Sequence, residues 1–443
     1  MLTEKLFGVI SLGCDKNRVD SEKLIGLIKD KGCRLTDNLS EAQIVIINTC
    51  AFLESARTEA IETILDCANY KKRKLEKIVV TGCLPEKFID ELYEPLVEAD
   101  VFLGITDYEK IFEALEESYA KCERQNFVKK GNDGYIYSRV LTTDEHYAYI
   151  KIADGCYNHC TYCLIPKIRG KYRSYPMENI LREAEELGET AELIVVAQDT
   201  TRYGEDLYGK NCFVELLQKL SALENIQAIR LLYCYPDVIG DELIEEIATN
   251  DKILKYIDIS LQHSEDRVLK LMNRKGKRKG YLALLNKIRQ RIPDIAIRST
   301  FISGFPTESE EEFEGMKAFL QEAKFFNCGF FAYSKEPDTG AYRLKPQVHH
   351  STKQRRVRAL YELQAQISTE ILRDFVGREI EVLCDGIDYE RNCFVGRAYF
   401  SAPDIDGKVY FHAGEAMQGK RYKVLIERSD AYDLYGRTED YEE

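Results

Sequence analysis

Short apolar runs alternate with amphipathic stretches of helical length through the first third of the chain. The apolar runs predict strands at residues 7–12, 43–48, 77–81 and 101–103, and the stretches that follow them predict helices at 21–31, 54–71, 85–97 and 108–119. A continuous apolar run such as 44–47 is typical of a parallel strand that is buried on both faces. We therefore expect an α/β fold that begins with a doubly wound open sheet.

The same alternation resumes after residues 123–144, a polar, glycine-containing segment that we interpret as a linker. Six further strands are predicted at 147–153, 192–197, 228–234, 256–261, 295–303 and 329–333, with helices at 176–187, 213–223, 238–249, 278–291 and 308–323. Six such units predict a central (β/α)6 partial barrel, and its chemistry is expected at the carboxyl ends of the strands.

The pattern changes after residue 345. Residues 351–375 form a charged stretch with Leu360, Leu363, Ile367 and Ile371 at helical spacing, which predicts a connecting helix. Short alternating runs between 379 and 438 predict a small antiparallel β-barrel. The predicted organisation is an N-terminal domain at 1–122, the linker at 123–144, a central domain at 145–345, the helix at 346–375 and a terminal barrel at 376–443.

Composition narrows the class of protein. With 443 residues, of which 44% are hydrophobic and 31% charged, the chain is long enough for two or three domains with their own cores. The first residues lack the features of a secretory signal, and no apolar run approaches the roughly 20 residues that cross a bilayer, so we expect a cytoplasmic protein without a membrane partner. A net charge of -13 argues against a protein that coats nucleic acid unaided.

Two cysteine triplets point to the chemistry. Cys156, Cys160 and Cys163 form a Cys-x3-Cys-x2-Cys cluster, and a further three cysteines each follow a predicted strand by one or two residues, namely Cys14, Cys50 and Cys83. Parallel strands end at one sheet edge, so these chain-distant thiols are expected to meet there. Three thiolates leave one iron of a 4Fe-4S cluster open to a substrate or cofactor. A zinc site, the alternative, would need a fourth protein ligand, which His159 could offer only from inside the loop.

The loop from Cys156 to Cys163, with Tyr162 directly before its last cysteine, resembles the signature of the radical S-adenosylmethionine (SAM) superfamily. The resemblance implies that the amino and carboxylate groups of SAM bind the open iron. It also implies that an electron from the cluster cleaves SAM and that the resulting 5′-deoxyadenosyl radical abstracts hydrogen from an unactivated C–H bond. The cofactors would carry this step, and the protein would supply orientation and exclusion of water.

With the second triplet and the terminal barrel added, nearly the whole chain is similar to the methylthiotransferase family, and the barrel to a TRAM domain. The ribosomal-protein branch of that family is matched by residues 11–22, 165–174 and 197–204, whereas the tRNA branch usually has Gln-Asn-Val in place of 198–200. Two positions depart from the family: Thr307 stands where Gly is common, and Asp15 where Pro is frequent. Neither position is a cysteine, so only loop details are affected.

The resemblance implies an enzyme that adds a methylthio group to the β-carbon of an aspartate in the twelfth small-subunit ribosomal protein. It implies two 4Fe-4S clusters held by the six cysteines, with no catalytic residue beyond these ligands. Of two SAM molecules, one would methylate a sulfur on the N-terminal cluster and the other would yield the radical. An electron donor is implied as a further partner. The alternatives are a tRNA adenosine methylthiotransferase and a non-catalytic iron-sulfur electron carrier.

SAM is expected to lie at the strand ends of the central domain. The candidate contacts are Tyr162, Gln198, Gln262, Arg298, Ser303 and Gly304. His263 is either a further site residue or a structural histidine. Arg298 lies inside a predicted strand, where it could bind a carboxylate of SAM or substrate, or form an internal ion pair.

Charge distribution suggests the macromolecular partner. Residues 376–443 carry nine basic and fifteen acidic side chains, a net charge of -6, which would steer a basic ribosomal protein toward the terminal barrel. The basic run 274–279 is either a solvated helix start or a contact with ribosomal RNA.

Overall fold

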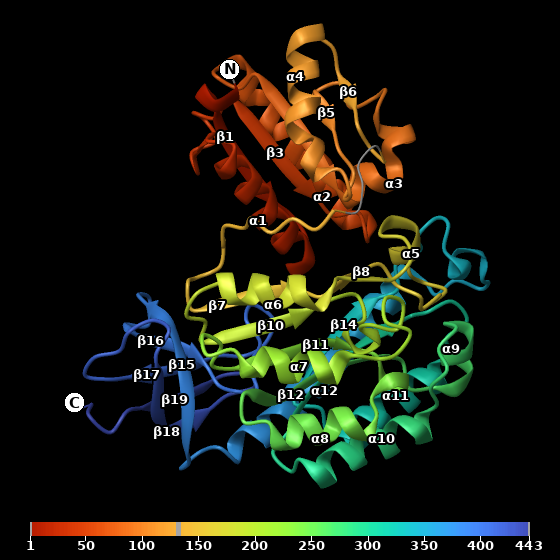
Figure 1. Cartoon of the computed structure of the whole chain (residues 1–443). Helices are drawn as coiled ribbons and strands as arrows, with labels where there is room; N and C mark the ends of the chain where they lie inside the picture. Colours follow the sequence, from red (N-terminus) through yellow and green to blue (C-terminus); the bar gives the residue numbers. More distant parts are fainter. Residues whose placement is uncertain (1, 130–133, 442–443) are drawn as a thin grey trace. The chain divides into compact units, whose positions relative to one another are not determined.

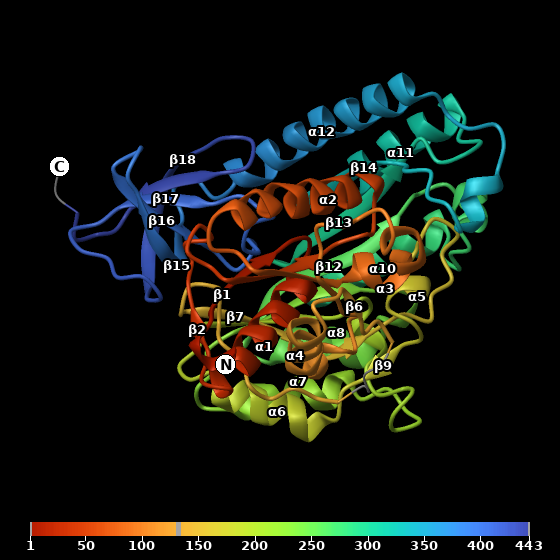
Figure 2. The same ribbon diagram turned by 90° about the horizontal axis from the view of Figure 1, so that it is seen from above.

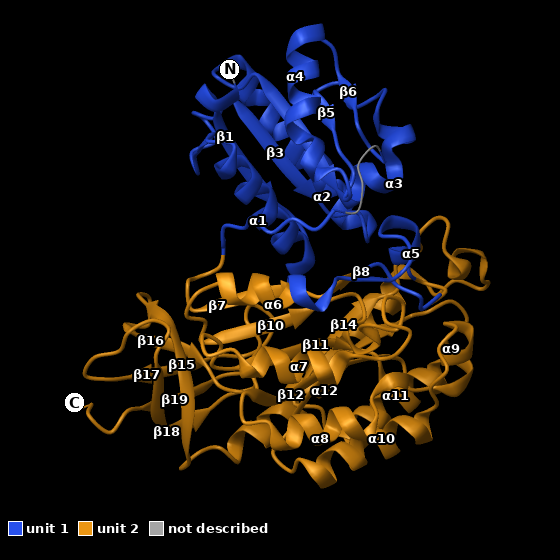
Figure 3. Ribbon diagram, in the orientation of Figure 1, with its two compact units in different colours: residues 1–142, 154–159, 163–179 blue, residues 143–153, 160–162, 180–443 orange. Residues whose placement is uncertain are grey.

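The computed structural model describes residues 2–129 and 134–441 (Figure 1). It contains two compact units, which Figure 3 distinguishes by colour. The first unit consists of residues 1–142, 154–159 and 163–179, and the second of residues 143–153, 160–162 and 180–443.

The first unit is built on a six-stranded parallel sheet with the order β2-β1-β3-β4-β5-β6. Its elements are η1 (Leu2–Glu4), β1 (Leu6–Ser11), α1 (Asp15–Asp30), β2 (Arg34–Leu35), β3 (Ile44–Thr49), α2 (Glu54–Ala68), η2 (Asn69–Lys72), β4 (Lys77–Gly82), α3 (Cys83–Leu92), β5 (Val101–Phe102), η3 (Tyr108–Lys110), α4 (Ile111–Lys121) and β6 (Gln125–Asn126). The chain leaves β1 toward β2 at one edge and returns to β3 on the other side. This order confirms the predicted open sheet.

Helices cover both faces of this sheet (Figure 2). Val45, Ile47 and Val80 join one core with residues of α2 and α3. Ile46 and Val79 alternate with them along the strands and join a second core with residues of α1 and α4. Successive side chains of a strand point to opposite faces, so the continuous apolar runs fill both cores. The prediction of a doubly wound sheet is therefore confirmed.

The second unit contains another six-stranded parallel sheet, with the order β14-β13-β12-β11-β10-β7. The strands are β7 (Tyr147–Lys151), β10 (Glu192–Val196), β11 (Ile229–Cys234), β12 (Ile253–Gln262), β13 (Ala296–Ser303) and β14 (Asn327–Ala332). The sheet keeps two free edges, as a partial barrel does. All six strands lie where the sequence predicted them, within a few residues.

Helices and short turns connect these strands. They are α6 (Met177–Glu186), η4 (Thr200–Arg202), α7 (Phe213–Ala222), η5 (Pro236–Val238), α8 (Asp241–Thr249), α9 (Asp266–Leu271), α10 (Arg278–Arg291), α11 (Glu310–Ala323) and η6 (Gly340–Arg343). Between β7 and α6 the chain forms β8 (Ala153–Asp154), α5 (Ile165–Ile168) and β9 (Arg173–Ser174). The cysteine-rich loop lies between β8 and α5, as expected from its place after the first strand of the central domain.

The predicted connecting helix is α12 (His350–Arg373). It is held to the end of the central sheet by side chains: Gln364 Nε2 donates to the Phe325 carbonyl at 2.9 Å, and Ser368 Oγ donates to the Phe326 carbonyl at 2.9 Å. Although α12 is 24 residues long, neither it nor any other described helix has the length and apolar character needed to cross a membrane.

The terminal barrel is closed, with the order β15-β16-β17-β19-β18. Its strands are β15 (Glu379–Asp388), β16 (Cys393–Arg397), β17 (Val409–His412), β18 (Arg421–Ser429) and β19 (Leu434–Arg437). The sequence predicted an antiparallel barrel, and one pairing corrects this: β17 and β19 run parallel, while the remaining pairs are antiparallel. The cause is that β19 inserts between β17 and β18 instead of following β18 around the barrel.

Buried ion pairs tie the barrel to the central sheet within the second unit. Glu192, the first residue of β10, lies between Arg230 of β11 at 2.5 Å and Arg397 of β16 at 2.6 Å. Burial alone would raise the pKa of Glu192, but the charges of the two arginines and their hydrogen bonds lower it to about 2. A buried carboxylate held in this way is costly to leave without its partners.

The segment that we predicted as a linker contributes structure to the first unit. Its residues 125–126 form β6, and Arg139 forms a buried ion pair with Glu22 of α1 at 2.5 Å. Thr142 donates its backbone N–H to the same carboxylate at 2.8 Å. Part of the predicted linker, 130–133, lies outside the described residues.

Candidate functional site

The first cysteine triplet follows three neighbouring strands of the first sheet. Cys14 comes after β1 at the N-cap position of α1, Cys50 follows β3, and Cys83 begins α3 directly after β4. The gap between β1 and β3 is where the strand order reverses, the place where open α/β sheets bind ligands. Helix N-termini also favour thiolates at Cys14 and Cys83. The structure thus brings three chain-distant thiols to one edge, as the sequence predicted.

The thiols are close enough to affect one another electrostatically. Burial raises the pKa of Cys83 to about 12, the nearby Arg169 charge opposes this rise, and the charges of Cys14 and Cys50 add to it. Burial also raises the pKa of Cys50, and the charge of Cys14 contributes to the rise. A bound cation would relieve this repulsion between thiolates, so the donor set suits a soft metal centre.

No three His, Cys, Asp or Glu side chains converge on a single-ion site within the described ranges 2–129 and 134–441. A 4Fe-4S cluster needs a different arrangement of ligands. Each cysteine binds its own iron, so the sulfurs lie apart around the cluster and do not converge on one point.

Two glycines shape this edge of the sheet. Gly13 has φ +94°, and a Cβ placed on it would lie 2.6 Å from the Cβ of Cys50. Gly82 has φ +93°, and a Cβ there would lie 2.2 Å from Asn48 Oδ1. Both positions combine a backbone conformation that favours glycine with a close approach, so any side chain would displace the segments that carry the cysteines.

Arg169 is a residue of this site that lies in the stretch 165–174, and the sequence predicted no role for it. Its buried guanidinium contacts Asp20 at 3.0 Å and Asp154 at 2.9 Å, and it donates to Asn17 and, at 3.5 Å, to Cys83 Sγ. A positive charge therefore faces the N-terminal triplet. The local sequence gave no signal for it, because the acceptors lie up to 152 residues away.

The second triplet lies in the irregular loop between β8 and α5. Two of its sulfurs accept backbone hydrogen bonds: Cys156 Sγ from Asn158 N–H at 3.3 Å, and Cys163 Sγ from Ile165 N–H at 3.4 Å. Such donors stabilise a thiolate and tune the sulfurs of a bound cluster. Cys156 and Cys163 belong to the first unit and Cys160 to the second.

Four predicted SAM contacts lie at strand ends of the second unit. Gln198 is two residues past β10, Gln262 ends β12, and Ser303 ends the neighbouring β13, with Gly304 next. Gln262 has φ +71°, an unusual backbone conformation for a residue with a side chain and one that is frequent at functional sites. Tyr162 packs in a small apolar cluster with Phe305, which places it beside the end of β13.

Glu308 holds the turn after β13 in place and was not singled out from the sequence. Its carboxylate accepts from Gly304 N–H at 2.9 Å and Ser303 Oγ at 3.3 Å, and it pairs with Arg356 of α12 at 2.5 Å. His263 faces it through Nε2 at 3.3 Å and accepts the Glu265 N–H at Nδ1. His263 thus takes the structural role that the sequence left open. Burial alone would raise the pKa of the Glu308 carboxyl, but the contact with His263, the hydrogen bond from Gly304 and the charge of Arg356 together lower it.

Arg298 lies apart from the other predicted SAM contacts. It is five residues before the end of β13, or about 16 Å along the strand. Its guanidinium contacts Asp258 at 3.2 Å and Asp406 of the barrel at 3.2 Å. Of the two roles left open by the sequence, this is the internal ion pair. Arg298 looked accessible to SAM because the sequence did not reveal Asp406, its partner 108 residues away.

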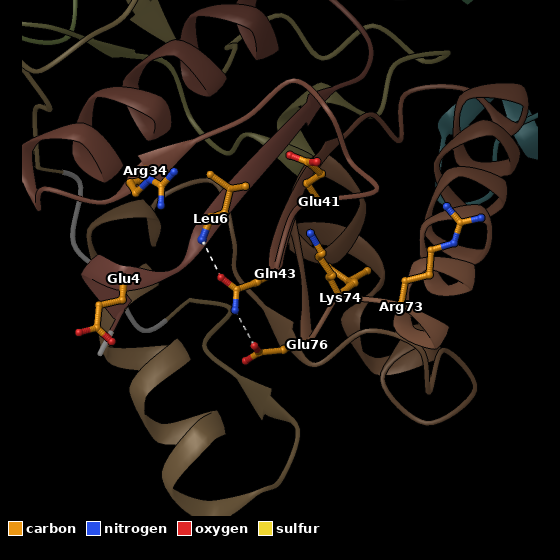
Figure 4. A pocket seen from close by; sticks show the side chains of 9 residues that line it. Glu4, Leu6, Arg34, Glu41, Gln43, Arg73, Lys74 and Glu76 are labelled. Carbon is orange, nitrogen blue, oxygen red and sulfur yellow. Dashed lines mark hydrogen bonds between the residues drawn. The ribbon is translucent and has the colours of Figure 1, made fainter.

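A surface pocket occupies the opposite edge of the first sheet (Figure 4). It is lined by Glu4, Leu6, Arg34, Glu41, Gln43, Arg73, Lys74, Leu75 and Glu76. The side-chain amide of Gln43 is hydrogen-bonded there at both ends: Oε1 accepts from Leu6 N–H at 3.3 Å, and Nε2 donates to Glu76 at 2.9 Å. The pocket lies at the amino ends of β1, β3 and β4, away from the cysteines at their carboxyl ends.

Comparison with protein families assigns most of the chain. Residues 150–320 match the radical SAM superfamily, residues 6–104 match an uncharacterized protein family named UPF0004, and residues 376–438 match the TRAM domain. Among solved structures, the radical SAM methyltransferase TsrM from Kitasatospora setae, with cobalamin and a [4Fe-4S] cluster bound, has a TM-score of 0.58 at 13% identity, covering 76% of this chain and 77% of TsrM. That likeness shows the fold alone.

Curated relatives match over nearly the full length. The ribosomal protein uS12 methylthiotransferase RimO of Clostridium kluyveri is 47% identical over 439 residues, with 97% of both chains covered. RimO of Clostridium botulinum is 45% identical, covering 99% of both chains, and RimO of Lachnoclostridium phytofermentans is 44% identical, covering 97% of this chain and 99% of its own. With its three family matches in the same order, the chain belongs to the RimO family of radical SAM methylthiotransferases and is a transferase.

Proposed function

We propose that this enzyme adds a methylthio group to the β-carbon of an aspartate in ribosomal protein uS12, in place of one hydrogen. Relatives named as uS12 methylthiotransferases and similar along almost the entire chain support the substrate. Family membership implies a 4Fe-4S cluster and SAM. The proposal extends this to two clusters and two SAM molecules.

The observation that carries the proposal is the meeting of Cys14, Cys50 and Cys83 at one sheet edge with buried Arg169 beside them. Radical generation needs only the triplet of the loop between β8 and α5. A second triplet in a separate sheet supports a second cluster, whose open iron would hold the sulfur to be transferred. Together the bound clusters and SAM supply the reductive and radical chemistry that no side chain can perform.

The residues of the chain supply ligands, orientation and charge. Cys156, Cys160 and Cys163 would bind the radical-generating cluster, and Cys14, Cys50 and Cys83 the other. We assign SAM contacts to Gln198, Gln262, Ser303 and Gly304, which lie at strand ends of one sheet, and to Tyr162 of the cysteine loop, which packs beside the end of β13. Glu308 would keep the turn at Gly304 in the binding conformation through its hydrogen bonds. Arg298 is omitted because Asp258 and Asp406 already engage it.

We further propose that the acidic terminal barrel attracts the substrate protein. Its net charge of -6 favours a basic protein over tRNA, whose phosphates it would repel. The exposed lysines of the basic run would contact ribosomal RNA beside the substrate; they are Lys275, Lys277 and Lys279. An electron donor completes the set of partners.

Anaerobic reconstitution tests the two-cluster proposal. We expect about eight irons per chain, and about half of that when either triplet is replaced by Ala, because each triplet would hold one cluster. Cys122→Ala, which changes an exposed cysteine outside both triplets, should keep the full iron content. Zinc in the purified protein, or a single cluster in the unaltered chain, would contradict the proposal.

Incubation of the reduced protein with SAM and uS12 tests the reaction. Release of 5′-deoxyadenosine and the appearance of one methylthio group on an aspartate, followed by mass spectrometry, are expected. Transfer to tRNA with unmodified uS12 would favour the tRNA alternative. An absence of SAM cleavage despite two reducible clusters would instead favour an electron carrier.

A further inference from the structure

Arg274 opens the basic run 274–279, but unlike the lysines of that run it is buried, with only 6% of its surface exposed. It follows α9 in the second unit, and its guanidinium points at the loop that carries Cys160. Nη1 lies 3.8 Å from Cys160 Sγ and 3.4 Å from Tyr162 Oη. Nη2 donates to the Ser260 carbonyl, near the end of β12. The first residue of the run is therefore part of a protein interior and not of a solvated helix start.

Arg274 contacts sulfur, phenol and backbone carbonyl groups. Among the described residues it forms no ion pair with Asp or Glu, and its Nε–H is buried without a hydrogen-bond acceptor. Apart from the contacts above, its guanidinium lies over the ring of Tyr235, with 4.3 Å from Cζ to the ring centroid. A buried cation without a counter-ion is strongly destabilising. The phenols of Tyr162, Tyr235 and Tyr281 also face Arg274. A thiol ionises more readily than a phenol, so the sulfur of Cys160 is the group best suited to carry the opposite charge.

We propose that Arg274 is a positioning residue for the cluster of this loop: its charge balances that cluster, and its contacts hold Cys160 and Tyr162 to the end of β12. The inference rests on the proposed function, in which the loop binds a 4Fe-4S cluster. Arg169 stands in the corresponding relation to Cys83, so in both triplets a buried arginine lies against a sulfur.

The charge of Arg274 has a measurable effect on reduction. A 4Fe-4S cluster with three thiolate ligands is negatively charged and becomes more negative when it accepts an electron. A fixed positive charge beside it therefore stabilises the reduced form more than the oxidised form, which raises the reduction potential. Lysine retains the charge but not the planar fork of donors, so Arg274→Lys should keep most of the electrostatic effect and lose the geometry of the hydrogen bonds.

The experiment measures the potential of this cluster alone. Full-length protein carrying Cys14→Ala, Cys50→Ala and Cys83→Ala is reconstituted, so that only the loop cluster is present, and the reduced cluster is followed by electron paramagnetic resonance at defined potentials. In this background Arg274→Gln should lower the ratio of reduced to oxidised cluster about tenfold at a fixed potential, equivalent to about 59 mV for one electron. Arg274→Lys should recover most of that loss. Lys275→Gln, which removes the adjacent exposed charge, should have little effect because solvent screens it.

Each outcome decides the proposal. An unchanged potential in Arg274→Gln overturns it, as does a shift that Arg274→Lys fails to reverse or that Lys275→Gln reproduces. If Arg274→Gln does not fold, Arg274→Lys alone still discriminates, since a tenfold lower ratio in a variant that keeps the charge would contradict the role of charge. If the loop binds no cluster even with Arg274 intact, the proposed function fails first, and the iron content distinguishes that result from a failure of this inference.

Discussion

At the scale of single residues, backbone conformation decides where the thiols lie. Gly82 ends β4 with a positive φ and is in close contact with Asn48 and Thr49 of β3. The next residue is Cys83, so the turn that only glycine fits also directs this thiol toward the edge where Cys14 and Cys50 lie. The conformation of Gly82 therefore helps to place Cys83 beside the other two thiols.

Substitution of Gly82 tests this dependence. Gly82→Ala should lower the free energy of unfolding by about 2 to 4 kcal/mol, because strain from the positive φ adds to the overlap with Asn48. Gly32 provides the control, since it has φ +76° but no atom within 4 Å of the Cβ that alanine would add, and Gly32→Ala should cost only about 1 kcal/mol. Urea denaturation measures both. Equal losses in the two variants would show that the close approach has no consequence.

The sequence predicted the positions of the two cysteine triplets better than the residues that surround them. The spacing of the cysteines and their places after apolar runs were enough to predict both triplets. Arg169 and Arg274 were not recognised as residues of the sites, because the contacts of a buried arginine depend on side chains far away in the chain. Arg298 was predicted to contact SAM for the same reason. Its acidic partner lies in the barrel and could not be recognised from the sequence.

At the scale of elements, the positions of the strands were predicted closely, but the start of helix α1 was not. Apolar runs mark strands well because both faces of a parallel strand are buried. The strands that escaped are short, namely β2, β6 and β9, and carry too few residues to show a period. Helix α1 begins at Asp15 and not near Ser21, because its first turns bury polar residues, Asn17 and Asp20 among them, around Arg169. A hydrophobic pattern cannot reveal such a start.

The stability that Glu192 contributes where β10, β11 and β16 meet is expected to depend on pH. The pKa of Glu192 is about 2 in the folded protein and near 4.5 when unfolded. Its stabilising effect, about 3 kcal/mol, is therefore complete above pH 4.5 and disappears as the pH falls through 2. Glu192→Gln should be less stable than the unaltered protein by that amount at pH 6, and the gap should close on acidification. Urea midpoints across this range measure it, and a gap independent of pH would contradict the assignment.

At the scale of the whole molecule, buried charge makes the barrel part of the second unit. The pair formed by Arg298 and Asp258 of the central sheet is completed by Asp406 of the barrel, which also accepts from Tyr256 Oη at 2.8 Å. The barrel would therefore present its acidic surface from a fixed position on the central sheet, as a firmly attached part of the same unit.

Replacing Arg298 tests this attachment. Arg298→Met leaves two buried carboxylates without their cation and should destabilise the unit by about 3 to 5 kcal/mol, with faster hydrogen exchange in both the central sheet and the barrel. Arg291→Met, which removes an exposed partner of Glu245, should cost less than about 1 kcal/mol. If Arg298 bound SAM instead, its loss would weaken SAM binding and leave exchange in the barrel unchanged.

The placement of these counter-charges has a consequence during synthesis of the protein. Glu192 emerges from the ribosome 205 residues before Arg397, and Arg298 emerges 108 residues before Asp406. Closure of the barrel must also wait for β19, because this strand fills the gap between β17 and β18. A nascent central sheet therefore lacks the partners of its own buried charges, so the sheet and the barrel reach their stable form together and late.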